Sequence, residues 1–133
     1  MIVFVCDNNA CHSIMAQAIF EHLQPDILVQ SAGEYASFVR SEVRFVLDEE
    51  GIVSKGLHSK AIAAVDWDDV VLVVQLCGDE FAPFTPSRIE KQMWWLPDPL
   101  AAPQNERHEA CRALRDELYR RTQKLCRELG LPS

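Results

Sequence analysis

Short apolar runs alternate with stretches of helical spacing along this chain. Apolar runs at residues 2–5, 27–30, 70–76 and 92–96 predict four strands. The run at 70–76, VVLVVQL, is the strongest of these signals, because it is almost continuously apolar and rich in β-branched residues. The first run is followed at once by a cysteine, Cys6, and then by a polar loop.

Apolar positions with helical spacing follow each of the first two strands and the last one. The first helix is expected to begin at Ser13, which can cap it, and its apolar positions continue to Leu23. Residues 38–50 are amphipathic and end at Gly51, residues 59–65 suit a short helix, and residues 106–129 form the longest helical pattern. Alternating strands and helices predict an α/β fold of three layers, α/β/α, with a four-stranded parallel sheet and one domain over residues 1–133.

Composition narrows the class of protein. The 133 residues are 48% hydrophobic and 25% charged, as in an ordinary globular domain. A net charge of −7 disfavours nucleic-acid binding. No apolar run approaches the ~20 residues of a membrane span, and no leader peptide is evident, so we expect a cytoplasmic protein without membrane attachment. Five cysteines without a disulfide-like spacing fit a reducing compartment.

The loop after Cys6 has the features of an anion site. Backbone N–H groups of a loop between a strand and a helix can converge on an oxyanion, and the helix N-terminus adds partial positive charge. Both effects lower the pKa of a thiol and favour the nucleophilic thiolate. The alternative is that Cys6 is only a small buried hydrophobic residue.

The residues around this loop also resemble a known family. The segment VFVCDNNACHSIMAQAIF resembles the opening of the low-molecular-weight tyrosine phosphatase superfamily, in particular its arsenate reductase branch, with C-x5-R-S followed by M-A-E-A. Further similar segments are SAGEYASFVRSEVRFVLDEEGI, HSKAI, and VVLVVQLCGDEF followed by WWLPDP. The resemblance covers nearly the whole chain and implies the low-molecular-weight phosphatase fold.

The resemblance also implies roles for particular residues. Cys6 would be the nucleophile, Cys77 the thiol that resolves its adduct, and Asp98 the general acid. Cys11 would be an additional redox thiol, whereas Cys111 and Cys126 on the last helix are expected to be ordinary core or boundary residues. The anion would lie among Asp7, Asn8, Asn9, Ala10, Cys11, His12 and Ser13, with Asn9 bracing the loop and Ser13 donating to the thiolate.

The implied activity is reduction of arsenate to arsenite. The bound partner would be a small oxyanion such as arsenate, phosphate or sulfate. The electron donor would be thioredoxin, glutaredoxin or a low-molecular-weight thiol, with no tightly bound cofactor. Two alternatives stay open: a phosphatase for phosphotyrosine or small esters, and a catalytically degenerate domain that binds an anion, a metalloid or a partner. We expect no metal site, since Cys6, Cys11 and His12 lack an evident fourth ligand.

Two departures from the family pattern favour the degenerate alternative. His12 stands where the family carries an arginine, whose planar fork can bind two oxyanion oxygens at once. Reductases that use thioredoxin also carry a further cysteine shortly after the one at Cys77, and residues 78–84 contain none. An internal relay of thiols would therefore need either an outside thiol or Cys11 as a substitute.

Overall fold

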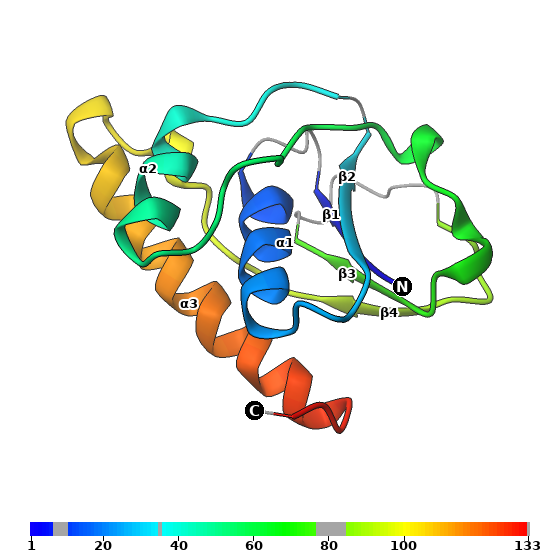
Figure 1. Cartoon of the computed structure of the whole chain (residues 1–133). Coiled ribbons are helices and arrows are strands. Elements are labelled where there is room, and N and C mark those ends of the chain that lie inside the picture. Colours follow the sequence, from blue (N-terminus) through cyan, green and yellow to red (C-terminus); the bar gives the residue numbers. More distant parts are fainter. Residues whose placement is uncertain (7–10, 35, 77–84, 133) are drawn as a thin grey trace.

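A parallel sheet forms the centre of the protein. The computed structural model describes residues 1–6, 11–34, 36–76 and 85–132. Its strands are β1 (Ile2–Cys6), β2 (Val29–Gly33), β3 (Leu72–Gln75) and β4 (Glu90–Met93), all parallel, in the order β2-β1-β3-β4 (Figure 1). The α/β fold with a four-stranded parallel sheet is therefore confirmed.

The strand boundaries differ from those predicted in two places. The second strand begins at Val29 rather than at residue 27, because Ile27 and Leu28 still belong to the turn after the first helix. The fourth strand spans Glu90–Met93 rather than 92–96, and its residues are mostly exposed. An edge strand has one paired neighbour, and its other edge is unpaired. A polar sequence such as EKQM can therefore pair there although it lacks an apolar run.

Three α-helices cover one face of the sheet (Figure 1). They are α1 (His12–Leu23), α2 (Ser41–Glu49) and α3 (Arg107–Glu128). Side chains at alternate positions of β1 point into this layer, and the ring of Phe4 packs against those of Phe20 and Trp94, with centroids 6.1 and 6.0 Å away. The core on this face includes the sulfurs of Cys6, Cys11 and Cys111.

The opposite face of the sheet is covered by short 3-10 helices. Val3, Val5 and Val73 point to this side and pack against η1 (Ile62–Ala64) and the segment that leads into η2 (Trp67–Asp69). The short helix expected at 59–65 is therefore a single 3-10 turn, because Ala61 instead forms a bridge with Gly33 at the sheet edge. Two further 3-10 turns, η3 (Pro99–Ala101) and η4 (Gln104–Glu106), precede α3.

A buried arginine joins α2 to α3. Arg115 is only 6% exposed, and its Nη1 donates to the carbonyl of Val46 and to Glu49, both at 2.9 Å. Glu49 is also held by Arg112, whose Nη2 lies 2.8 Å away. Because the guanidinium bonds both a helix carbonyl and a carboxylate, it fixes the position of α2 on α3. Within the described ranges, no helix combines the length and apolar content needed to cross a membrane.

Candidate active site

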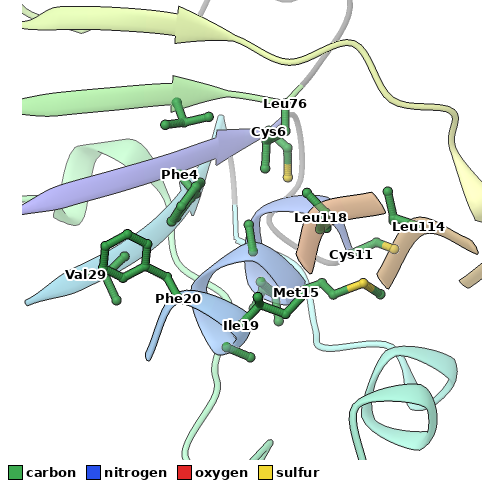
Figure 2. Close-up of a cluster of buried hydrophobic side chains, with 14 of the residues drawn as sticks. Phe4, Cys6, Cys11, Met15, Ile19, Phe20, Val29, Leu76, Leu114 and Leu118 are labelled. Atoms are coloured by element: carbon green, nitrogen blue, oxygen red, sulfur yellow. The ribbon is translucent and has the colours of Figure 1, made fainter. Parts of the chain in front are cut away.

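Cys6 ends the central strand and contacts the first turn of α1. Its side chain is 1% exposed, and its Sγ lies 2.8 Å from the Oγ of Ser13, which is fully buried. A hydroxyl in this position can donate to a thiolate and stabilise its charge. Figure 2 shows Cys6 at the tip of β1, with its sulfur directed toward the start of α1.

The sequence pattern predicts Ser13 as the cap of the first helix, but in the structure Ser13 does not cap it. The N-cap residue is Cys11, which makes no side-chain capping bond, and α1 begins at His12. Ser13 instead lies inside the first turn, and its hydroxyl faces the sulfur of Cys6. The predicted contact between Ser13 and Cys6 is thus present in the structure, and the predicted cap is wrong because the hydroxyl is used by the sulfur.

Part of the predicted site lies outside the described residues. These are Asp7, Asn8, Asn9 and Ala10 of the expected anion-binding loop, and Cys77, the expected resolving thiol. What the structure describes is the two ends of the loop: Cys6 at the end of β1, and Cys11, His12 and Ser13 at the beginning of α1. An anion between these ends would face the N-terminus of a twelve-residue helix.

His12 contacts the segment that carries the expected general acid. Its Nε2 lies 2.8 Å from the carbonyl oxygen of Pro97, the residue before Asp98. A carbonyl only accepts, so the ring nitrogen that faces it carries the proton and donates. In this arrangement the imidazole connects the start of α1 to the Asp98 segment, and only Nδ1 remains for another partner.

Asp98 is fixed by its own turn. Its Oδ1 accepts a hydrogen bond of 2.9 Å from the backbone N–H of Leu100 and caps η3. Its charge also helps to raise the pKa of Cys11 and opposes the lowering of the pKa of Cys111. Asp98 therefore lies near the starts of both α1 and α3.

Cys111 is a residue of this region that the sequence pattern did not single out. A hydrogen bond between the thiols of Cys11 and Cys111 raises the pKa of Cys11 and, despite burial, lowers the pKa of Cys111. Burial raises the pKa of Cys11 further. Nothing in the local pattern could reveal the pair, because its members belong to helices at opposite ends of the chain.

The described residues hold no cluster of three or more His, Cys, Asp or Glu side chains arranged for a metal ion. Cys11 and His12 are neighbours in sequence, but the imidazole Nε2 is directed to Pro97, whereas the Cys11 sulfur is directed to Cys111.

Comparison with known proteins gives one consistent family. Residues 1–131 match the family described as low molecular weight phosphotyrosine protein phosphatase. In sequence, the chain is 31% identical over 129 residues to the arsenate reductase of Shouchella clausii, with 93% of each chain covered. It is 35% identical over 78 residues to the glutaredoxin arsenate reductase of Synechocystis sp., covering 58% of this chain and 60% of that one.

The fold gives the same result. A solved arsenate reductase in its phosphate-binding state superposes with a TM-score of 0.81 at 28% identity, covering 96% of both chains. The predicted resemblance to this family and to its arsenate reductase members is confirmed by these relatives. Because the family match extends over almost the whole sequence, this chain belongs to the low molecular weight phosphotyrosine protein phosphatase family.

Proposed function

We propose that this protein reduces arsenate to arsenite, with Cys6 as the nucleophile. The observation that carries the proposal is the 2.8 Å contact between the Cys6 sulfur and the Ser13 hydroxyl, at the point where the central strand leads toward α1. A buried sulfur with a hydroxyl donor beside a helix N-terminus can be kept as a thiolate. The arsenate reductases among the relatives support this reaction over the other activities of the family.

The first step forms a bond between sulfur and arsenic. The thiolate of Cys6 attacks the arsenic atom, and one arsenate oxygen leaves as water after it has received a proton. Asp98 supports this step as the acid, because its carboxyl group is fixed at the N-terminus of η3 near the starts of α1 and α3. In this adduct arsenic is still arsenic(V) and is still bound to the Cys6 sulfur, so arsenite has not yet been released.

Release of arsenite requires a second thiol. When that thiol attacks the sulfur of Cys6, the electron pair of the S–As bond stays on arsenic, which leaves as arsenite, and a disulfide remains. Cys77 and Cys11 are the thiols of this chain that the family resemblance assigns to such a role. A glutaredoxin or thioredoxin, or a small thiol, would then reduce the disulfide, in agreement with the glutaredoxin arsenate reductase among the relatives.

The site should also bind other tetrahedral oxyanions. A related arsenate reductase has been solved in a phosphate-binding state, and phosphate and sulfate have the size and shape of arsenate. Each would occupy the anion loop without being reduced. They should therefore compete with arsenate, and their binding should depend on the start of α1.

The test is a reductase assay with defined electron donors. The full chain is incubated with arsenate and, in separate reactions, thioredoxin with its reductase and NADPH, or glutathione with glutaredoxin, and arsenite is measured directly. We expect arsenite with at least one donor and none with Cys6→Ser. Cys126→Ser is the matched control, because Cys126 is also buried but lies on the distal part of α3. Absence of arsenite with every donor would exclude the proposal.

A phosphatase is the second candidate, because its chemistry would need only Cys6, the anion loop and Asp98 as the acid, and no second thiol. The observation that favours it is the contact of His12 with Pro97, which holds the Asp98 segment against the start of α1. Release of a phenol from an aryl phosphate, abolished by Cys6→Ser, would support this activity. Anion binding without either activity would instead identify a degenerate binding domain.

A further inference from the structure

A cavity of about 300 Å³ lies between β4 and the second half of α3. Gln92 of β4 and Trp94, directly after this strand, line one side of it. Both point to the face of the sheet that the helices cover, because they are two residues apart and the ring centroid of Trp94 lies 6.0 Å from that of Phe4. None of the described residues of the candidate active site lines this cavity, so it is a separate site.

Three basic side chains of α3 line the other side of the cavity. Arg120 and Arg121 precede Lys124 by four and three residues, so all three extend from one side of the helix. Leu125, which is 1% exposed, and Trp94, which is 8% exposed, form the apolar part of the lining. Ligand cavities span about 300–1,000 Å³, so this one has room for a compact small molecule.

The charge around the cavity is opposite in sign to that of the whole protein. Arg120, Arg121 and Lys124 face a single carboxylate in the lining, that of Glu128. The nearby Glu117 pairs with both arginines, but even with it the cations outnumber the carboxylates. The chain as a whole carries a net charge of −7. A local excess of positive charge in a hollow of a negative protein favours an anion at this place.

Hydrogen-bond donors approach the cavity from both sides. Nε of Arg121 donates to Glu117 at 2.8 Å, whereas among the described residues no group accepts from its two terminal nitrogens. On the strand side, Oε1 of Gln92 accepts from the indole N–H of Trp94 at 3.2 Å, so the NH₂ group of Gln92 is the part available to a ligand. A guanidinium fork opposite an amide donor suits carboxylate or phosphate oxygens.

We propose that this cavity binds a small organic dianion, the chemistry shared by phosphate monoesters and dicarboxylates. The two terminal nitrogens of Arg121 hold one end of the anion, Gln92 donates from the strand, and Lys124 supplies further charge. The carbon part of the ligand contacts Leu125 and Trp94. The site is independent of the proposed reductase activity, because it uses neither Cys6 nor the anion loop. Its bounded volume favours a compact molecule over an acidic peptide along the edge of β4.

The test is a titration followed at the indole N–H of Trp94 by NMR of the ¹⁵N-labelled full chain. Trp94→Phe identifies the signal, and Trp67, which packs on the opposite face of the sheet, is the internal reference. The probes are glycerol 3-phosphate, succinate and, as the neutral control, glycerol. We expect a saturable shift of the Trp94 signal with at least one dianion and none with glycerol. The dianion with the lower Kd shows whether the site prefers a phosphate or two carboxylates.

Two substitutions in the lining should change the affinity in opposite directions. Arg121→Gln removes the fork and its charge, so the Kd should rise about tenfold or more. Glu128→Gln removes the carboxylate that repels the anion, so the Kd should fall severalfold. Arg112→Gln is the matched control, because Arg112 is another arginine of α3 but pairs with Glu49 and does not line the cavity. Opposite changes in two variants cannot result from a general loss of folding.

Three results would overturn the proposed site. The first is the lack of a saturable shift with either dianion in the millimolar range. The second is a Kd that Arg121→Gln and Arg112→Gln change equally, since the anion would then bind elsewhere, for example at the anion loop. The third is a shift with an acidic peptide but with neither dianion. Because the readout is the Trp94 signal and not arsenite, a protein without reductase activity would leave this inference intact.

Discussion

His12 donates from Nε2 to the carbonyl oxygen of Pro97 at 2.8 Å, across a separation of 85 residues in the sequence. This contact gives the histidine a task different from that of the arginine found at this place in the family pattern. An arginine would direct its guanidinium to the anion, whereas the imidazole connects the start of α1 to the segment that holds Asp98. The replacement therefore removes a permanent charge from the start of α1 and adds a contact with the segment that holds Asp98.

Removal of the imidazole should loosen the Asp98 segment. In His12→Ala, we expect the rate of arsenite release in a single turnover to fall about three- to tenfold, because a neutral hydrogen bond contributes about 0.5–1.5 kcal/mol. His12→Gln keeps a side-chain donor and should restore part of the rate. Stopped-flow or quenched-flow measurement gives the rates. Equal rates in the alanine and glutamine variants would show that the contact with Pro97 does not matter.

A guanidinium at this position should strengthen anion binding. His12→Arg adds a permanent positive charge and two parallel donors, and charge-assisted bonds contribute about 1.5–3 kcal/mol. We expect the Kd for phosphate to fall about tenfold to a hundredfold, measured by calorimetry. His12→Lys supplies the charge without the planar fork and should gain less. An unchanged Kd in both variants would mean that the side chain at residue 12 cannot reach the anion.

Loss of the Ser13 hydroxyl should make Cys6 less acidic. In Ser13→Ala, a thiolate at Cys6 loses its donor at 2.8 Å, so the pKa of Cys6 should be higher than in the unchanged protein. The pH dependence of Cys6 alkylation measures it. Ser31→Ala is the matched control, because Ser31 is another buried hydroxyl but donates to Gln17 at 2.6 Å. A pKa that moves equally in both variants would contradict the assigned contact.

Arg115 should contribute to stability through its contact with α2. Arg115→Ala leaves the Val46 carbonyl without this donor and removes a buried stem, and we expect a loss of about 1–3 kcal/mol in the free energy of unfolding. Urea denaturation measures the loss. Arg120→Ala is the control and should cost less than about 1 kcal/mol, because Arg120 is an exposed residue that pairs with Glu117 on its own helix.

Glu117 should give a pH-dependent contribution to stability. Hydrogen bonds from Arg120 and Arg121 lower the pKa of Glu117 from 4.5 to about 2. A lowered folded-state pKa stabilises the fold above pH 4.5, and this stabilisation is lost as the pH falls toward 2. The stability difference between the unchanged protein and Glu117→Gln, measured by urea denaturation, should therefore shrink between pH 6 and pH 3, starting from less than about 1 kcal/mol because the side chain is partly exposed.

The strand and helix pattern of this protein is local, and for that reason the sequence predicts most of it. Val70 to Leu76 is apolar enough to indicate a buried strand in any context, and the apolar positions of α3 repeat at helical spacing over its whole length. The apolar pattern does not predict a strand at Glu90 and Lys91, because an edge strand depends on its neighbour β3 for pairing rather than on its own apolar content. Residues 59–65 form only a 3-10 turn because pairing of Ala61 with Gly33 leaves too few residues for a longer helix.

By itself, the sequence determined the order of the elements, the position of Cys6 between a strand and a loop, and the family to which these residues point. Only the tertiary structure decided which side chains meet: His12 with Pro97, and Cys11 with Cys111. The reason is physical. Local propensity and periodicity act over a few residues, whereas a contact between distant segments depends on how three helices pack on one face of the sheet, which no short pattern encodes.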